Sequence, residues 1–492
     1  MSELPADTRD DAPPAAGASA AAGIALALLM GVAATQYAWN AVGIPALAGY
    51  DAGPHVGYIL AIVETGRLPD LHSGTLTFHP PLYYLLGSRV WSLLEPAGPD
   101  AISAGLRAIG GIASLLAGVV CWFMVRARAS WPVAWVATAL VLFVPVGQMS
   151  AAMVGNEALA AGLAALALPS ILALQRDPHR IGQAALAGLF AGLAFATKFS
   201  GFFVVAACAV PFLRRDFDRG MLRALAVGLA VAAIIAGPVY ARNWLVAGSP
   251  FPFTRLEEPL KSMEAGNILR PRRLSDYLWV DPACLLRPSI HHVEGGSLAP
   301  RRRNPDMTNV WGLAYASIWY DAQGHRIPLE FHRDGVYTGP LLTLLGILPT
   351  GLMLFGFGLA VVDAVRRRGR SHDAPLVVLF GVGITFFVAF TWWAQSVVAV
   401  KGSYLLPLCV PAGVFFARGV TRLGARWQPL LLSLCTLAAL VSAVVFTHDL
   451  VYSASPAERM AHRYHVMGEF LPNSYIAEAA DRLVLERDAE PR

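Results

Sequence analysis

Residues 50–84, YDAGPHVGYILAIVETGRLPDLHSGTLTFHPPLYY, follow the first apolar run of the chain and decide how the rest of it crosses a membrane. The stretch begins with an acid and also holds three histidines, a Pro-Pro pair and a run of aromatic residues. A plain connector between two membrane spans would be short and polar. Because ionisable groups crowded at a membrane face are costly, this composition indicates chemistry.

The composition of the whole chain is that of a polytopic membrane protein. Of its 492 residues, 56% are hydrophobic and only 14% are charged. Soluble domains carry about 25% charged residues, so the deficit indicates many membrane spans. The net charge of +5 does not indicate a nucleic-acid partner, because most Lys and Arg residues sit in short clusters between apolar runs. Four of the five cysteines lie in apolar runs, so we expect neither a structural disulfide nor a cysteine-based metal site.

Eleven apolar runs are candidate membrane helices, although several are short and require tilt or a thinned bilayer. Residues 1–20 are rich in Ala, Pro and Asp and are expected to be disordered. The first run has no basic segment before it, so we expect a retained helix and not a cleaved signal. The predicted spans are 21–43, 102–125, 132–150, 157–174, 181–197, 199–213, 224–241, 338–362, 374–393, 403–420 and 428–447.

The basic residues between these runs predict the topology. With the N-terminus in the cytoplasm, all five basic clusters fall on the cytoplasmic side, as the positive-inside rule requires. Residues 77–96 then cannot span, because one more span would turn every cluster outward. Residues 44–101 are therefore expected outside, with interfacial helices at 55–64 and after Pro80-Pro81. The clusters are Arg126/Arg128, Arg176/Arg180, Arg214/Arg215/Arg219, Arg366/Arg367/Arg368/Arg370 and Arg418/Arg422/Arg426.

This topology predicts an all-α polytopic membrane protein with two membrane modules. Residues 21–241 hold the first seven spans, including the outer loop 44–101, and residues 338–447 hold the last four. Between them lies a long outer loop, 242–337, rich in Pro, Arg and aromatic residues. A polar tail, 448–492, is expected outside, with a helical pattern near 456–469.

Asp51 is the leading candidate for catalysis, because it follows the first span at the outer face. A carboxylate there can accept a proton from a hydroxyl group held near it. An ordinary helix cap before Gly53-Pro54 is an equally good interpretation. His55 lies four residues further on, where it orients the acid, contacts substrate or is simply a partly buried interfacial histidine.

The string HPPLYY, residues 79–84, is either a substrate contact or a helix start with an aromatic anchor. Its histidine, together with His72, Asp51 and His55, offers candidate metal ligands. No tight histidine spacing supports such a site, so a divalent metal is not indicated.

Asn156 and Glu157 open the fourth span, where an N-cap followed by a dipole-favoured acid explains them and a substrate contact is also compatible. Three cations, Lys198, Arg242 and Lys401, share the outer face with the candidate acid. Snorkelling to lipid headgroups explains any one of them. Three together with a carboxylate fit a site for an anionic headgroup better than a scaffold.

These segments, in their order and spacing, resemble the integral-membrane glycosyltransferases with a GT-C fold that use dolichyl- or polyprenyl-phosphate sugars. That superfamily includes protein O-mannosyltransferases and lipid A aminoarabinose transferases. The resemblance runs through most of the membrane part. It is carried by Tyr50-Asp51 with His55 and Tyr58, GRLP (66–69), HPPLYY with His79, Tyr83 and Tyr84, GNEALAA from Gly155, ATKFSG from Ala196, ARNW from Ala241, and GSYLLP from Gly402 with Tyr404.

The resemblance implies a fold, a reaction and partners. Asp51 would be the general base, and Lys198 and Arg242 would hold the lipid phosphate. The donor would be a polyprenyl-phosphate sugar, and the acceptor a lipid, a glycan or a protein. The implied location is the plasma (inner) membrane of a bacterium, with a cytoplasmic N-terminus and an outer active site.

The chain departs from the family pattern at two positions. Many relatives have Asp-Glu where this chain has Asp51-Ala52, which leaves the role of the second acid open. Many have Gly-Arg-Tyr where this chain has Gly402-Ser403-Tyr404, and Lys401 is one candidate to replace that arginine.

Three other functions fit parts of the sequence. A transporter or flippase of lipid-linked glycans shares the spans and outward cations, although transporters usually place charges near the midplane and often show repeated halves. An oligosaccharide transferase with a lipid-pyrophosphate donor is the alternative within the enzyme interpretation. A scaffold without catalysis leaves the Asp51 region unexplained.

Overall fold

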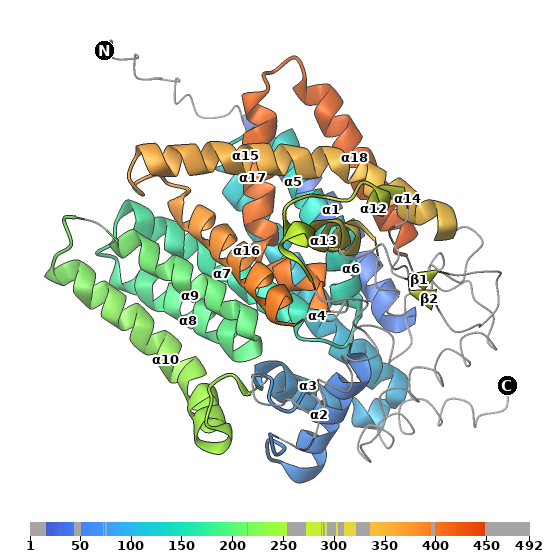
Figure 1. Cartoon of the computed structure of the whole chain (residues 1–492), viewed down its shortest axis with the longest axis vertical. Coiled ribbons are helices and arrows are strands. Elements are labelled where there is room, and N and C mark those ends of the chain that lie inside the picture. The colour runs from blue at the N-terminus through green and yellow to red at the C-terminus, as the bar shows by residue number, and fades with distance from the viewer. Residues whose placement is uncertain are drawn as a thin grey trace.

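The computed structural model describes a helical protein, with a pair of two-residue strands, β1 (His291–His292) and β2 (Arg302–Arg303), in its long loop (Figure 1). This confirms the predicted all-α class. Residues outside the described set include 1–15, His72 and the tail with its expected helix at 456–469. The described residues are 16–43, 51–71, 73, 76–213, 215–252, 272–286, 288, 291–292, 302–303, 309–320, 335–394 and 399–447.

Each predicted span corresponds to one helix or to a run of two or three consecutive helices, but the count of eleven spans is not confirmed. In the described part of the chain, eight helices are long and apolar enough to cross a membrane, or nine with the bent pair α5 and α6. Two predicted spans are shorter apolar segments, α8 (Ile181–Thr197) and the run of η2 (Phe199–Gly201), α9 (Phe202–Ala209) and η3 (Val210–Phe212). The other span helices are α1 (Ala16–Gly43), α4 (Pro99–Arg126), α5 (Trp131–Phe143), α6 (Pro145–Ala152), α7 (Glu157–Arg176), α10 (Arg219–Ala247), α14 (Gly335–Leu345) with α15 (Ile347–Arg366), α16 (Ala374–Trp393), η8 (Gly402–Leu408) with α17 (Cys409–Arg422), and α18 (Gln428–Val445).

Most helix boundaries differ from the predicted spans by a few residues, and two of the differences change an interpretation. α1 begins at Ala16, so residues 16–20 are helical and not disordered, because their Ala-rich sequence favours helix. α10 continues to Ala247, where Gly248 ends it in a left-handed conformation. Arg242 therefore lies on the last turns of a helix and not in the loop that follows one.

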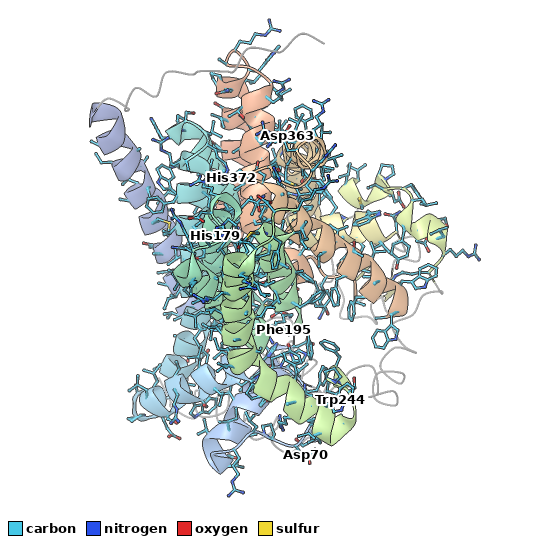
Figure 2. The ribbon with its side chains drawn as sticks, turned by 90° about the vertical axis from the view of Figure 1, so that its left-hand side faces the viewer. Asp70, His179, Phe195, Trp244, Asp363 and His372 are labelled. Carbon is cyan, nitrogen blue, oxygen red and sulfur yellow. The ribbon has the colours of Figure 1, made fainter. Side chains whose placement is uncertain are left out.

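The five basic connectors meet at one end of the helix bundle. Ion pairs and a histidine–carboxylate hydrogen bond tie each connector to another, which is the arrangement that the charge pattern predicts. In Figure 2, His179, His372 and Asp363 lie toward one end, while Trp244 and Asp70 lie at the other. The contacts are Arg128–Asp373 (3.5 Å), Arg418–Asp373 (2.8 Å), Arg370–Asp216 (3.5 Å) and His179–Asp218 (2.9 Å).

The stretch that decides the topology forms two short helices at the opposite end, α2 (Ala52–Thr65) and α3 (Leu82–Leu94), with η1 (Glu95–Ala97) after the second. With 14 and 13 residues they are too short to be spans. α2 packs on α3 and α3 on the start of α4, so that Ile59, Trp91 and Leu106 belong to one apolar cluster. The structure thus agrees with two non-spanning helices, at Gly53-Pro54 and after Pro80-Pro81.

A break between α5 and α6 supports the segment that leads to Asn156. The two helices meet at an angle of 51°, because Pro145 has no N–H to continue the hydrogen-bond ladder. The freed carbonyl groups of Leu142 and Phe143 accept hydrogen bonds from the Tyr37 hydroxyl and the Gln148 amide, both at 2.6 Å. Every residue of α6 is buried. These two hydrogen bonds therefore hold in place the segment that leads from α6 to α7.

Small residues set the closest helix crossings. A Cβ atom built on Gly356 of α15 would lie 1.8 Å from the carbonyl oxygen of Phe415 in α17. Only glycine permits this approach, which is typical of helix pairs in membranes.

The described part of the long loop packs onto the bundle. It contains η5 (Leu274–Tyr277), α12 (Ala283–Leu286) and α13 (Val310–Trp319). Arg272 donates hydrogen bonds to the carbonyl groups of Thr391 and Ala394 at the end of α16. α13 is largely buried, and Ser317 on it accepts a hydrogen bond from the Gly402 amide at 2.7 Å. The loop therefore supports the backbone beside Lys401.

Candidate active site

The structure brings all twelve predicted site residues to one end of the bundle, opposite the basic connectors. They come from α2, α3, the starts of α7 and η8, the end of α8 and the last turns of α10. Sequence positions up to 350 residues apart are joined here, as in the contact of Lys401 with Asp51. This convergence could not be read from any single motif.

Asp51 forms an ion pair with Lys401 and does not cap its own helix. The distance from Lys401 Nζ to Asp51 Oδ2 is 3.2 Å, and the lysine side chain is 10% exposed against 38% for the acid. Asp51 stands at the N-cap of α2 in the left-handed region, φ 54°, with no side-chain cap. Burial by itself lowers the pKa of Lys401, but the Asp51 carboxylate, then Tyr404 and Glu157, raise it above its ordinary value. Lys401 is therefore an ammonium ion.

A second ion pair joins Glu157 to Lys198. Lys198 Nζ lies 2.5 Å from Glu157 Oε1 and 3.2 Å from Asn156 Oδ1, and the two charged side chains are 11% and 8% exposed. Asn156 occupies the N-cap position of α7 but makes no side-chain cap. The ammonium also lies 5.4 Å from the ring centre of Tyr404. The capping interpretation of Asn156 is wrong in this respect, because its side chain instead binds the lysine.

The two histidines of this cluster are neutral; His55 is buried and His79 is half-buried. His55 Nδ1 is hydrogen-bonded to the Tyr84 hydroxyl at 2.9 Å, and that hydroxyl lies 3.3 Å from His79 Nδ1. Burial lowers the pKa of His55 to about 4 and the pKa of His79 to about 3. Asn156 Nδ2 lies 3.4 Å from His79 Nδ1, which links the histidines to the second ion pair. The histidines act as polar contacts and carry no positive charge at neutral pH.

A stack of aromatic rings links this cluster to Arg242. Tyr58 stacks on Tyr84 with ring centres 3.8 Å apart, and Tyr84 stacks on His55 at 5.6 Å. Burial raises the pKa of Tyr58 to about 12, against the opposing effect of the nearby Arg242 guanidinium. Arg242 donates a hydrogen bond to the Pro69 carbonyl at 2.5 Å, which ties α10 to the GRLP segment. Tyr83 is fully buried and packs edge-on against His55 and Tyr84, so it supports the stack from behind.

An aromatic wall formed by Phe78, Phe199, Tyr240 and Phe251 meets this cluster at His79, and the sequence did not reveal it. The ring centre of His79 lies 4.8 Å from that of Phe78 and 6.2 Å from that of Phe199. Phe199 is 6.0 Å from Tyr240 and 5.6 Å from Phe251, measured between ring centres, and Phe78 stacks on it at 6.4 Å. Phe195, near the end of α8, stacks on Tyr240 with ring centres 4.1 Å apart. Figure 2 shows Phe195 between His179 and Trp244 along the bundle. The available signal was adjacency, because Phe199 follows Lys198 and Tyr240 precedes Arg242 by two residues.

The donor set of this site does not suit a divalent metal. Among the described residues no three His, Cys, Asp or Glu side chains are grouped so that they could hold one ion. Each of the two carboxylates also faces a lysine ammonium. His72, a ligand candidate from the sequence, lies outside the described residues.

Residues 79–241, about a third of the chain, match the family model described as dolichyl-phosphate-mannose-protein mannosyltransferase. That range includes His79, Glu157 and Lys198, while Asp51 and Lys401 lie outside it. A search of curated proteins found no match.

The oligosaccharyltransferase AglB of Archaeoglobus fulgidus has a similar structure. Its complex with an inhibitory peptide and a dolichol-phosphate superposes with a TM-score of 0.53 at 14% identity, over 96% of this chain and 61% of that one. The chain has a GT-C fold. The resemblance to GT-C membrane proteins predicted from the sequence is therefore confirmed for the fold, and the chain spans about three fifths of the length of AglB.

Two further structures complete the comparison. AglB has also been solved with Zn and sulfate, and this complex matches with a TM-score of 0.52 at 16% identity, over 95% of this chain and 58% of that one. ArnT of Cupriavidus metallidurans bound to undecaprenyl phosphate matches with a TM-score of 0.41 at 16% identity, over 93% and 82%. The ArnT score is too low to establish a common fold by itself.

Proposed function

We propose that this GT-C protein is a membrane glycosyltransferase that moves a sugar from a polyprenyl-phosphate donor to an acceptor hydroxyl. The observation that carries the proposal is the convergence of Asp51, two lysine–carboxylate pairs and Arg242 at one end of a helix bundle. The family match and the fold of AglB support the same class. A polyprenyl phosphate also suits a site that combines an arginine with an aromatic wall, because it has an anionic head and an apolar chain.

In the proposed reaction Asp51 takes the proton of the acceptor hydroxyl. The acceptor oxygen attacks the anomeric carbon from the face opposite the phosphate and forms the new glycosidic bond. The bond between the anomeric carbon and the phosphate oxygen breaks, so the configuration inverts and polyprenyl phosphate leaves. A phosphate is a good leaving group, so this step needs no second acid, and alanine at position 52 is compatible with it.

Positive charge near the phosphate would accelerate this step. The phosphate gains negative charge as it leaves, so a fixed cation stabilises the transition state more than the ground state. Arg242 is the best placed for this role, since it lies on α10 near Tyr58 of the ring stack and makes no ion pair within the described residues. Lys198 already binds Glu157, so it would act on the phosphate as part of that pair.

The proposed orientation places the basic connectors in the cytoplasm and the site at the outer face of a bacterial inner membrane. The positive-inside rule supports it, because all five basic clusters gather at one end. The same gathering of charge at the two ends argues against a transporter, whose charges usually lie near the midplane.

An oligosaccharide transferase with a lipid-pyrophosphate donor is the second candidate. The observation that favours it is the fold shared with AglB, an oligosaccharyltransferase. Comparing transfer from polyprenyl-phosphate and polyprenyl-pyrophosphate donors separates the two.

The decisive experiment is sugar transfer by the purified protein in lipid nanodiscs. Donors are polyprenyl-phosphate mannose and polyprenyl-phosphate glucose, and acceptors are a lipid, a glycan and a peptide. We expect Asp51→Asn to lose transfer while still binding undecaprenyl phosphate. Asp177→Asn, which removes an exposed carboxylate at the basic end, is the matched control. Full turnover by a well-folded Asp51→Asn protein would end the assignment of Asp51 as base.

A further inference from the structure

The proposed site contains two carboxylates, and each has an ammonium group where a metal ion would bind. Lys401 Nζ lies 3.2 Å from Asp51, and Lys198 Nζ lies 2.5 Å from Glu157. A divalent ion binds carboxylate oxygens at about 2.0–2.6 Å. An ammonium at hydrogen-bond distance thus competes directly with a metal for the same oxygen atoms.

Charge balance also disfavours an additional cation. The side chains of Lys401 and Lys198 are only 10% and 11% exposed, so water screens them poorly. A doubly charged ion next to either one would be repelled by its ammonium group. The neutral histidines do not relieve this, because protonating them is opposed by the same burial.

The backbone on both sides of the first pair is fixed. Asp51 has a left-handed conformation, which is unfavourable for a non-glycine residue and persists only where the surroundings hold it. Lys401 precedes Gly402, whose amide binds Ser317 of α13, and a Cβ at Gly402 would lie 2.7 Å from Ile318. The carboxylate and the ammonium are therefore presented to each other by rigid segments.

We propose that the ammonium groups of Lys401 and Lys198 replace a divalent ion in this site, with Lys401 as the positioning residue of Asp51. This inference rests on the proposed glycosyl transfer. Lys401 neutralises the carboxylate beside an anionic donor and aims it at the acceptor hydroxyl. Lys198 neutralises Glu157 in the same way, so that this carboxylate does not repel the phosphate. The reaction then needs no added metal.

The first test measures transfer with and without a chelator and with added Mg²⁺ or Mn²⁺. We expect the wild-type rate to be the same in all three conditions. Loss of activity with the chelator and recovery with metal would overturn the proposal. If the protein transfers no sugar from any donor, the proposed function fails, and metal binding decides the further inference. Stoichiometric binding of Zn²⁺ or Mn²⁺ that Asp51→Asn abolishes would overturn it, and an absence of such binding would support it.

The second test addresses Lys401 directly. We expect Lys401→Gln to lower turnover about 100-fold, a loss comparable to that of a general base, and to move the acidic limb of the pH–rate profile to higher pH. Lys401→Arg should restore part of the rate and the original profile, because the charge is kept but its geometry differs. Arg180→Gln, at the exposed basic end, is the control for loss of one positive charge. An unchanged rate and profile in Lys401→Gln would contradict the positioning role.

Discussion

The buried pair of Glu157 and Lys198 offers the sharpest test of how charge is held in this protein. Two unit charges about 4 Å apart interact by about 4 kcal/mol at an effective dielectric constant of about 20. Removing one partner of such a buried pair leaves an uncompensated charge and typically costs about 3–5 kcal/mol. We therefore expect Glu157→Gln to lower the free energy of unfolding by about 3 kcal/mol. Lys198 keeps its contacts with Asn156 and Tyr404, so the lower end of the range applies.

The double variant separates pairing from packing. Lys198→Met with Glu157→Gln removes both charges, and replacing a buried pair by uncharged groups of similar volume is often close to neutral. The double variant should thus be more stable than Glu157→Gln alone, which gives a strong coupling in a double-mutant cycle. The measurement is unfolding by denaturant in detergent micelles, monitored by the change in tryptophan fluorescence.

An exposed ion pair in the same chain supplies the control. Arg180 and Asp177 are 3.1 Å apart at the basic end, with side chains 59% and 45% exposed. Solvent screens such a pair, so the same cycle there should show little coupling. Equal, small effects at both pairs would refute the argument, as would a double variant that is destabilised by the sum of its two single changes.

Three other changes have defined outcomes. Arg242→Ala should weaken binding of undecaprenyl phosphate at least tenfold, about 1.4 kcal/mol, because a charge-assisted contact is lost, and unchanged binding in a titration would exclude Arg242 from the phosphate site. Burial lowers the pKa of His55 from 6.5 to about 4, so within that window the unfolded chain binds the extra proton. Stability should therefore fall as the pH drops from 6.5 to 4, less steeply in His55→Gln, and equal slopes in thermal melts would contradict this. Gly356→Leu should lower the melting temperature because its side chain meets the Phe415 carbonyl, whereas Gly351→Leu, which has open space, should not.

The sequence predicted the position of nearly every helix, and it did so for simple reasons. Apolar runs bounded by arginine are visible directly in the sequence. The positive-inside rule then indicated that residues 77–96 do not form a span. The structure agrees, since α2 and α3 are short and the basic connectors join at the other end. The number of spans was less certain, because α8 and the α9 segment are short and α5–α6 is bent at Pro145.

The partners of each charged residue could not be predicted from the sequence. Local patterns offered helix capping as the explanation for both Asp51 and Asn156. Capping depends on residues two or three positions away, whereas the contacts they make come from Lys401 and Lys198, far along the chain. The aromatic wall was missed for the same reason, since Phe199, Tyr240 and Phe251 meet only when α8 and α10 pack together.

The sequence by itself thus determined the membrane character, the two-ended distribution of charge and the set of residues at the site end. These properties follow from hydropathy and from the cost of placing charge in a bilayer, both of which act on each segment separately. Only the tertiary structure decided that the four charges form two neutral pairs, with Arg242 set apart beside the aromatic rings. Pairing depends on distances of a few ångströms between helices, and those distances are fixed by packing.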